Sequence, residues 1–513
     1  MNYRSLILLF ILVSIIFTGC ERNWGDHYDI YPETVNANVW DEMKKDSRIS
    51  KFCEILTQNQ YDTLFKTDIP YTLYIPSNEV LDDYLSQKTV DQNFIGYHFT
   101  PHFIQSGNIH GLRVVQTLID KYIHFERYGA LVKIDGKEVS FESPLYLNGK
   151  YFIIEDVIEP QPNLYEYFKM TNPVLSDYID SRDSIILDKE LSKPIGFDSL
   201  GNTVYDSVSD IINNFEVEYF EVKHEFRENA ATIVFPKSED YNNALNEVAS
   251  NLGGSMVDYR DIPLKWQYDV LMPFLFKKGI FLNRIEPQEF AWKIPPDTTK
   301  LLNIVGDSVI IDYIPTELAF CSNGYAYNYD DFQIPDSLYL GKSRKEAESL
   351  LFETGINRYR WREGVKVVSD VTFQPKRIYL ATASKDSLLS VDFPKGYTGK
   401  YSVEFKGPNL FPGKYQMIIE THMDYGGLWD IYVNGELVKS FNYYEFRRMN
   451  GVITSVTGQR FFPRGRYNKF DMYVEEIISY DEIDIKFDYK GPGTMVPYNG
   501  LLIDYIEFVP VTD

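Results

Sequence analysis

Metal or base chemistry in this chain would have to be built from its seven histidines. His98 and His102 have the four-residue spacing that suits two ligands on one helical face. Pro101 lies between them and disfavours a continuous helix. No histidine has a plausible cysteine or serine partner nearby in the sequence. We therefore expect no metal site, and we interpret His98 as a core residue and His102 as a loop residue.

Other catalytic signatures are also missing from the sequence. It contains no G-x-S-x-G, G-x-x-x-x-G-K or G-x-G-x-x-G motif. The 74 Asp and Glu residues would form some carboxylate pairs by chance, but no segment repeats strands and helices at the length of a catalytic barrel. We therefore predict no catalytic residues, no cofactor and no enzyme activity.

Aromatic residues beside polar ones are the remaining chemical theme. Sugar rings stack their C–H faces on Trp and Tyr, while their hydroxyls bond to polar side chains. Segments near the C-terminus have this mixture, and the ligand-binding residues predicted from them are Tyr425, Trp429, Tyr443, Tyr444, Arg447 and Tyr498. The alternative is that they pack over the end of a domain. Trp429 alternates with Ile431 and Val433, which favours the core for that residue.

The first twenty residues predict export. Arg4 precedes an apolar run from Leu6 to Phe17, which is shorter than a membrane span and typical of a signal peptide. Phe17-Thr18-Gly19-Cys20 resembles the lipobox of bacterial lipoproteins, which implies a signal peptide of residues 1–19 and acylation of Cys20. Residues 20–36 would form a tether. We expect an outer-membrane location, held by lipid alone and facing outward.

The charge and the cysteine content exclude one class of partner and one kind of fold stabilisation. The chain has 51 Lys and Arg against 74 Asp and Glu, a net charge of −23. This charge repels phosphate backbones, so nucleic acid is excluded as an expected partner. The other two cysteines, Cys53 and Cys321, are too few for a disulfide framework and are interpreted as small buried apolar residues.

Two sequence blocks occur twice. Residues 72–79, Thr-Leu-Tyr-Ile-Pro-Ser-Asn-Glu, align with residues 232–239, Thr-Ile-Val-Phe-Pro-Lys-Ser-Glu, and both predict a strand, a turn and a helix start. Residues 148–160 align with residues 323–335, and both open with Asn-Gly, continue as a strand and end at proline. The middle of the chain is therefore expected to hold two related modules.

These blocks resemble the two signature boxes of fasciclin domains. The first copy, residues 37–161, also has Tyr97-His98 where that family has a Tyr-His pair. The second copy, residues 162–338, has Phe274-Leu275 at the aligned place and a long polar insertion near residues 188–210. The resemblance implies two compact α/β modules used in adhesion or recognition, the second of them divergent.

The last segment, residues 339–513, predicts a different domain. Residues 482–489 alternate between polar and apolar, and Asn434-Gly435 lies between two strand-like runs as in a type I′ hairpin. Many short strands favour a β-sandwich, with residues 344–361 expected to be helical. The arrangement resembles lectin-like jelly rolls of carbohydrate-binding modules. The fold class predicted for the whole chain is thus multidomain, with two α/β modules followed by an all-β sandwich.

Two functions remain open from the sequence. Tandem fasciclin-like modules and a terminal sandwich on a lipid anchor resemble accessory proteins of glycan uptake. That resemblance implies that the protein binds a polysaccharide or oligosaccharide, beside an outer-membrane transporter complex. The alternative is an adhesive or scaffolding protein whose fasciclin modules bind protein partners.

Overall fold

The computed structural model describes residues 33–67, 69–225, 231–253, 256–291, 301–309, 318–330, 332–381, 383–422, 427–442, 467–492 and 499–511. Contacts divide the chain into two compact units. One consists of Met1–Phe235 with Lys277–Tyr329, and the other of Pro236–Phe276 with Asp330–Asp513. Cys20 lies outside the described residues, so its acylation stays a prediction.

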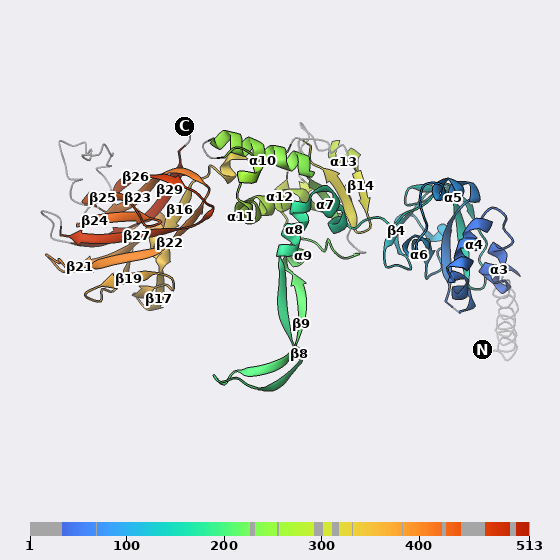
Figure 1. The fold of residues 1–513 in the computed structure, drawn as a ribbon, viewed down its shortest axis with the longest axis horizontal. Helices are drawn as coiled ribbons and strands as arrows, with labels where there is room; N and C mark the ends of the chain where they lie inside the picture. The colour runs from blue at the N-terminus through green and yellow to red at the C-terminus, as the bar shows by residue number, and fades with distance from the viewer. Residues whose placement is uncertain are drawn as a thin grey trace, which may run out of the picture. The chain divides into compact units, whose positions relative to one another are not determined.

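The first module is built on a seven-stranded sheet with helices beside it (Figure 1). The strands, in sheet order, are β2 (Phe99–Thr100), β1 (Tyr71–Pro76), β7 (Gly149–Ile154), β6 (Lys137–Glu142), β5 (Leu131–Ile134), β4 (Tyr122–Tyr128) and β3 (Gly111–Gln116). The helices are α3 (Val39–Met43), α4 (Ser50–Gln58), α5 (Asn78–Leu85) and α6 (Gln92–Tyr97). Strands β1 and β7 pair in parallel and are buried along their whole length, which explains their unbroken apolar character.

The first signature box folds as its residues predict. Strand β1 ends at Pro76, and Ser77 caps helix α5 by accepting a hydrogen bond from the Val80 amide at 3.5 Å. In the second copy, β10 (Ala231–Phe235) is followed by α10 (Ser238–Leu252), which has Glu239 in its first turn. The predicted order of strand, turn and helix is confirmed in both copies.

The second copy repeats the centre of the first sheet. Its strands are ordered β11 (Ile280–Leu282), β10, β15 (Gly324–Asn328) and β14 (Leu318–Cys321). Strands β10 and β15 are parallel, with Ala231 opposite Gly324, just as Tyr71 lies opposite Gly149. Further elements of this copy are α7 (Leu164–Thr171), α8 (Pro173–Ser181), α9 (Asn214–Glu218), α13 (Pro287–Ala291), β12 (Leu301–Leu302) and β13 (Ser308–Val309). The paired sequence blocks therefore form the same two central strands in the same register.

A buried threonine has the same role in both sheets. The Thr72 hydroxyl donates to the His102 carbonyl at 2.6 Å and accepts from the Ile104 amide at 2.9 Å. Thr232 repeats both bonds, at 2.8 and 2.9 Å, with the corresponding loop of the second copy. Both threonines are fully buried, so each supplies partners to loop backbone groups that water does not reach. This is a physical reason for Thr at the start of each first box.

The Asn-Gly of each second box is also explained. The Asn148 side chain accepts a bond from the Val39 amide at 3.0 Å, and Asn323 accepts one from the Leu164 amide at 2.8 Å. Each asparagine therefore holds the first residue of a module's opening helix against the start of its strand. A side chain on Gly149 would place its Cβ 2.4 Å from the Tyr71 carbonyl oxygen, so only glycine fits there.

The alignment of the Tyr-His pair in the second copy was wrong. Thr72 pairs with Thr100 and Thr232 pairs with Phe281, so Tyr97-His98 corresponds to Lys278-Gly279. The aligned Phe274-Leu275 lies one helical turn earlier. Helix α12 (Met272–Gly279) continues for one more turn after Phe274 before strand β11 begins. The sequence alignment matched aromatic residues and could not detect this extra turn.

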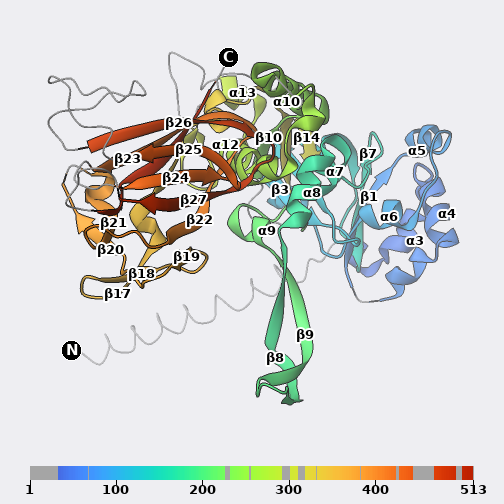
Figure 2. The ribbon, with the colours of Figure 1, turned by 60° about the vertical axis from the view of Figure 1, so that its left-hand side comes forward.

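The polar insertion forms a two-stranded arm. Strands β8 (Asp183–Phe197) and β9 (Thr203–Asn213) pair antiparallel between helices α8 and α9 and extend away from them (Figure 2). We refer to residues 183–213 as the arm. Its register shifts near residues 188–193 and again near residue 195.

The C-terminal residues form a β-sandwich around one apolar core. One sheet is β19 (Lys366–Ser369), β22 (Tyr401–Leu410), β27 (Asp481–Gly491), β24 (Leu428–Val433) and β25 (Glu436–Asn442). A second sheet is β16 (Ser343–Glu346), β29 (Tyr505–Pro510), β23 (Gly413–His422) and β26 (Tyr467–Ile477). A third is β20 (Lys376–Tyr379), β21 (Ser387–Phe393) and β28 (Asn499–Ile503). Alternate residues of β27 are buried, and Asn434 and Gly435 both have positive φ, which confirms the predicted strand and hairpin turn.

The helix expected at residues 344–361 is not present. These residues form β16, a short 3₁₀ turn, β17 (Leu351–Gly355) and β18 (Arg358–Trp361). Ser343 pairs with Phe508 and Glu346 with Tyr505, so a distant strand takes up a segment with helical propensity. In the same compact unit α10, α11 (Leu264–Trp266) and the first residues of α12 accompany the sandwich, and Trp266 packs edge-on against Phe411 at 4.9 Å.

Candidate functional site

Aromatic side chains gather at one end of the sandwich. We define the aromatic cluster as Phe373, Phe393, Tyr397, Tyr401, Trp429 and Tyr489. Phe393 is central, with its ring centroid 4.7 to 6.0 Å from those of the other five. It ends strand β21, while Trp429 and Tyr489 are cross-strand partners on β24 and β27. The strand ends of two sheets thus position the cluster.

Trp429 belongs to the core and not to an exposed binding surface. It is 1% exposed and stacks on Phe393 at 6.0 Å, on the buried face of β24 with Ile431 and Val433. A ligand that approached from solvent would not reach its ring. The prediction of Trp429 as a direct ligand contact is therefore withdrawn, and the strand alternation explains why.

Two polar atoms in the cluster have no hydrogen-bond partner among the residues that the structure describes. They are Nε1 of Trp429 and the hydroxyl of Tyr401, both buried. Burial raises the pKa of the Tyr401 hydroxyl, so it remains a neutral donor. A buried donor without a partner costs about 1–3 kcal/mol, so such atoms are sparse in folded proteins.

The described strand ends that flank the predicted ligand residues in the sequence lie around this cluster. Leu428, at the start of β24, lies opposite both Asn442 and Gly491, the last residues of β25 and β27. Asn499, at the start of β28, lies opposite Phe393 of the cluster. The predicted residues Tyr425, Tyr443, Tyr444, Arg447 and Tyr498 lie outside the described residues. The described residues that flank them in the sequence nevertheless lie at neighbouring strand ends.

Gly427 is a functional signal that sequence reasoning missed. It has φ of +127°, and an added Cβ would lie 2.8 Å from a Tyr489 ring carbon and 3.0 Å from Trp429 Nε1. The backbone before β24 therefore passes directly over two rings of the cluster, where no side chain fits. The pair Gly426-Gly427 in the sequence was the available clue.

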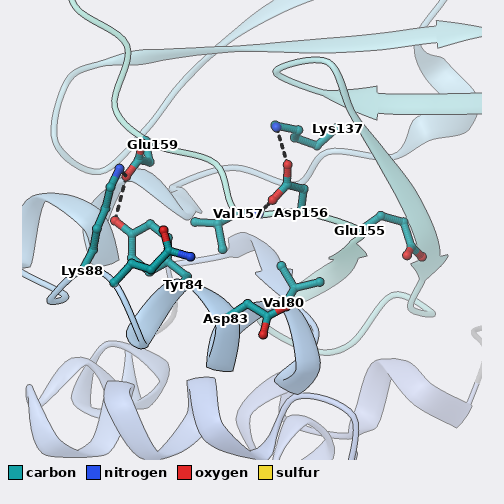
Figure 3. Close-up of a pocket in the computed structure, with 10 residues that line it drawn as sticks. Val80, Asp83, Tyr84, Lys88, Lys137, Glu155, Asp156, Val157 and Glu159 are labelled. Carbon is teal, nitrogen blue, oxygen red and sulfur yellow. Dashed lines mark hydrogen bonds and ion pairs between the residues drawn. The ribbon is translucent and has the colours of Figure 1, made fainter.

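A second hollow lies in the first module. Figure 3 shows this cavity of about 500 Å³, between α5 and the loop that follows β7. Most of its polar side chains already pair with one another: the Tyr84 hydroxyl donates to Glu159 at 2.8 Å, Lys88 donates to the same carboxylate at 2.6 Å, and Lys137 pairs with Asp156. Burial and the bond to Glu159 raise the pKa of Tyr84 to about 12.

This hollow is poorly suited to stacking a sugar. One neighbour of the Tyr84 ring is Phe94, stacked at 5.0 Å between ring centroids, and another is the Lys88 ammonium, 5.5 Å from the ring centroid. Contacts that already surround the ring leave little of it for a ligand. The aromatic cluster of the sandwich is therefore the better candidate site.

Neither a metal cluster nor a membrane-spanning helix is found among the described residues. Within the described ranges, no three His, Cys, Asp or Glu side chains gather where they could hold a metal ion. His98 is fully buried, and its Nδ1 lies 2.8 Å from the Phe94 carbonyl. No helix in the described part of the chain is long and apolar enough to cross a membrane. Cys53 and Cys321 are buried free thiols, as the sequence indicated.

Comparison with known proteins assigns the first module. Residues 47–160 match the family model described as the fasciclin domain. No curated protein matches the chain. Together with the repeated sheet of the second copy, the match makes this a multidomain chain in which fasciclin-like α/β modules precede an all-β region.

Solved structures resemble parts of the chain at low identity. A FAS1 domain pair from the insect cell adhesion molecule Fasciclin I is 11% identical, with a TM-score of 0.22, over 57% of this chain and 99% of its own. The C-terminal CBM6 of LamC, a laminarinase from Zobellia galactanivorans, is 10% identical, with a TM-score of 0.19, over 33% and 98%. A family 35 carbohydrate-binding module from Clostridium thermocellum is 11% identical, with a TM-score of 0.19, over 33% and 98%. At these low scores the likenesses carry no information about the site.

Proposed function

We propose that this protein is an outer-membrane lipoprotein, anchored through Cys20 and facing outward, that binds glycan at the aromatic end of its C-terminal sandwich. It acts as an accessory to the capture and uptake of polysaccharide, beside an outer-membrane transporter complex. The anchor rests on the first twenty residues, and the glycan rests on the chemistry of the site. In this proposal the fasciclin-like modules connect the anchor to the binding domain.

One observation carries the proposal. The described strand ends that flank the segments with four tyrosines and an arginine pair with one another at Leu428, Asn442 and Gly491, and Asn499 pairs with Phe393 of the aromatic cluster. Sugars need apolar ring faces to stack on and polar groups to meet their hydroxyls, and this end of the sandwich supplies both types. The net charge of −23 favours neutral or cationic glycans over polyanionic ones.

The test is affinity for a panel of glycans, measured by calorimetry on the mature chain. Tyr425→Ala, Tyr443→Ala, Tyr444→Ala and Tyr498→Ala are compared with the parent. Truncation of a stacked aromatic residue costs about 1–3 kcal/mol, so at least one variant should bind about 5- to 150-fold more weakly. The melting temperature should fall by no more than a few degrees.

Tyr379→Ala is the matched control. Tyr379 is 77% exposed and lies opposite Ser387, at the end of β21 away from Phe393. It removes an exposed tyrosine from the same domain and should leave glycan affinity unchanged. A folded parent that binds no glycan in the panel, or four variants that all bind as the parent does, would refute the proposed site.

A further inference from the structure

The arm exposes an unusual amount of apolar surface. Ile185, Phe197 and Leu200 are each at least 77% exposed, and Ile211 is 71% exposed. Other apolar residues of the arm are between 36% and 67% exposed: Ile186, Leu191, Ile195, Val204, Tyr205, Val208 and Ile212. Scattered single exposed residues are ordinary, but a continuous series along two strands marks an interaction surface.

The base of the arm is firmly held. Asp183 pairs with Asn213 across the strands, and the Asn213 side chain donates to the Ile179 carbonyl and to the Asp183 carboxylate, each at 2.6 Å. Lys223 forms ion pairs with Asp180 and Asp183. The arm is therefore fixed to helix α8 and projects from a defined base.

Beyond its base the arm has no third strand among the described residues. Strands β8 and β9 form a sheet by themselves, so each leaves one edge of backbone donors and acceptors unpaired in the described part of the chain. A two-stranded hairpin is marginally stable in water, and proteins usually protect such edges with bulges, proline or charge. Strand β8 has its register shifts and Pro194, whereas β9 has a regular edge and no proline.

The outward pattern of β9 identifies the chemistry of an added strand. Val204, Val208 and Ile212 alternate with Asp206 and Asp210 on one face of the strand. Lys193 lies opposite Asp206, but Ile186 lies opposite Asp210, so Asp210 faces no cation across the strands. Asp188 is opposite Val208 and is therefore a diagonal neighbour of Asp210 on the same face. A strand added at this edge would meet alternating apolar and acidic side chains.

Charge argues against a second copy of this chain as the occupant. Residues 184–212 contain five acidic residues and two lysines. If two β9 strands paired antiparallel about Val208, Asp206 of one copy would face Asp210 of the other, and like charges directly opposite are destabilising. Pairing about Ser207 would set each aspartate against a valine. A basic partner avoids both conflicts.

We propose that β9 is a docking edge for an extended segment of a partner protein, in which apolar residues alternate with Lys or Arg on one face. The segment adds as a third strand, so its backbone pairs with the free edge of β9. Its cations lie beside Asp206 and Asp210, and its apolar side chains cover Val204, Val208 and Ile212. This site is separate from the glycan site, and its test does not depend on glycan binding.

The probe is a short fluorescent peptide with threonine at every second position and with valine and lysine alternating at the positions between. A second peptide has Glu in place of Lys. Anisotropy with the mature chain should show binding of the Lys peptide and about tenfold weaker binding of the Glu peptide. Hydrogen exchange should show new protection of β9 amides when the Lys peptide is bound.

Asp210→Lys should lose this preference and bind the Glu peptide better than the Lys peptide. Glu353→Lys is the matched control, because Glu353 is an exposed carboxylate on the two-stranded β17–β18 hairpin, and it should behave as the parent does. Equal binding of both peptides, or no binding with unchanged exchange, overturns the proposal. A further outcome is that the parent self-associates in a way that Asp210→Lys changes, while the peptide gives no protection of β9. That result would make the arm a contact between copies of this chain and would also overturn the proposal.

Discussion

At the scale of single residues, His98 makes the stability of the first module depend on pH. The side chain is fully buried, and burial lowers its pKa to about 4, although its hydrogen bond to the Phe94 carbonyl opposes that shift. Donation to a carbonyl requires hydrogen on Nδ1, and Nε2 has no partner among the described residues. Protonation of His98 in the folded module would therefore place an unpaired N–H and a charge in the core.

His98→Phe should reduce the loss of stability in acid. Between pH 6.5 and 4 the unfolded chain binds a proton at His98 that the folded chain does not, so the free energy of unfolding falls as pH falls. The contribution is at most about 3 kcal/mol. The buried Asp135, whose pKa burial raises to about 6, acts in the opposite direction below pH 6 in both proteins. Hydrogen exchange of the β1 and β7 amides at several pH values measures this, and equal pH slopes for parent and variant would contradict it.

Thr72→Val and Thr232→Val test the shared threonine bridge. Each change keeps the side-chain shape but leaves a loop amide and a loop carbonyl without their partner. We expect a loss of about 2–4 kcal/mol in the module that carries the substitution and little in the other. Hydrogen exchange read separately on β1 and on β10 distinguishes the two. Equal destabilisation of both modules by either variant would be inconsistent with a local bridge.

At the scale of elements, the strongest sequence patterns were the local ones. The run that stops at Pro76, the alternation in β27 and the Asn434-Gly435 turn all depend on neighbouring residues, and all were predicted. The helix expected at residues 344–361 was wrong because β29 pairs with β16 from a great distance along the chain. The exposed apolar surface of the arm was not predicted, because these residues were interpreted from the sequence only as a polar insertion.

Residues 37–161 should fold as an isolated fragment. Both central strands, all seven strands of the sheet and their apolar clusters come from within this range. The fragment loses the half-buried ion pairs of Lys121 with Glu166 and Glu225 and the ring contacts of His124 with Phe320 and Tyr325, but none of these belongs to its two apolar clusters. Circular dichroism of the fragment should show α/β structure with a cooperative melting transition. A random-coil spectrum would contradict this expectation.

At the scale of the whole molecule, the sequence predicted the classes of domain better than the site. The order of α/β modules and sandwich follows from repeated blocks and periodicity, both of which can be read from the order of the residues alone. Of the six residues predicted to bind ligand, Trp429 proved to be core, and the other five lie outside the described residues. The aromatic cluster itself was not foreseen, because Phe393, Trp429 and Tyr489 come from three strands that only tertiary pairing brings together.

Cys20→Ser tests the anchor on which the proposed location depends. The change removes the thiol to be acylated, and no other cysteine follows the apolar run closely. We expect no fatty-acid label on the variant, and either an uncleaved precursor or a protein released from the membrane. Labelling of cells with a radioactive fatty acid measures this, with Cys53→Ser as the control that should remain labelled. Persistent label on Cys20→Ser would refute the lipobox.

The parallel pairing of β1 with β7 has a consequence for how the chain folds during synthesis. The central pair of strands in the first module cannot form until Gly149 is available to pair with Tyr71. In the second module Gly324 must likewise be available to pair with Ala231. Contacts so distant along the chain form slowly, because a long loop must close before they contribute. A chain that enters a translocation channel from its N-terminus therefore has no complete central sheet until the second box of each module has emerged. If the chain is exported as proposed, each module should therefore cross the membrane unfolded and form its sheet in one late step on the far side.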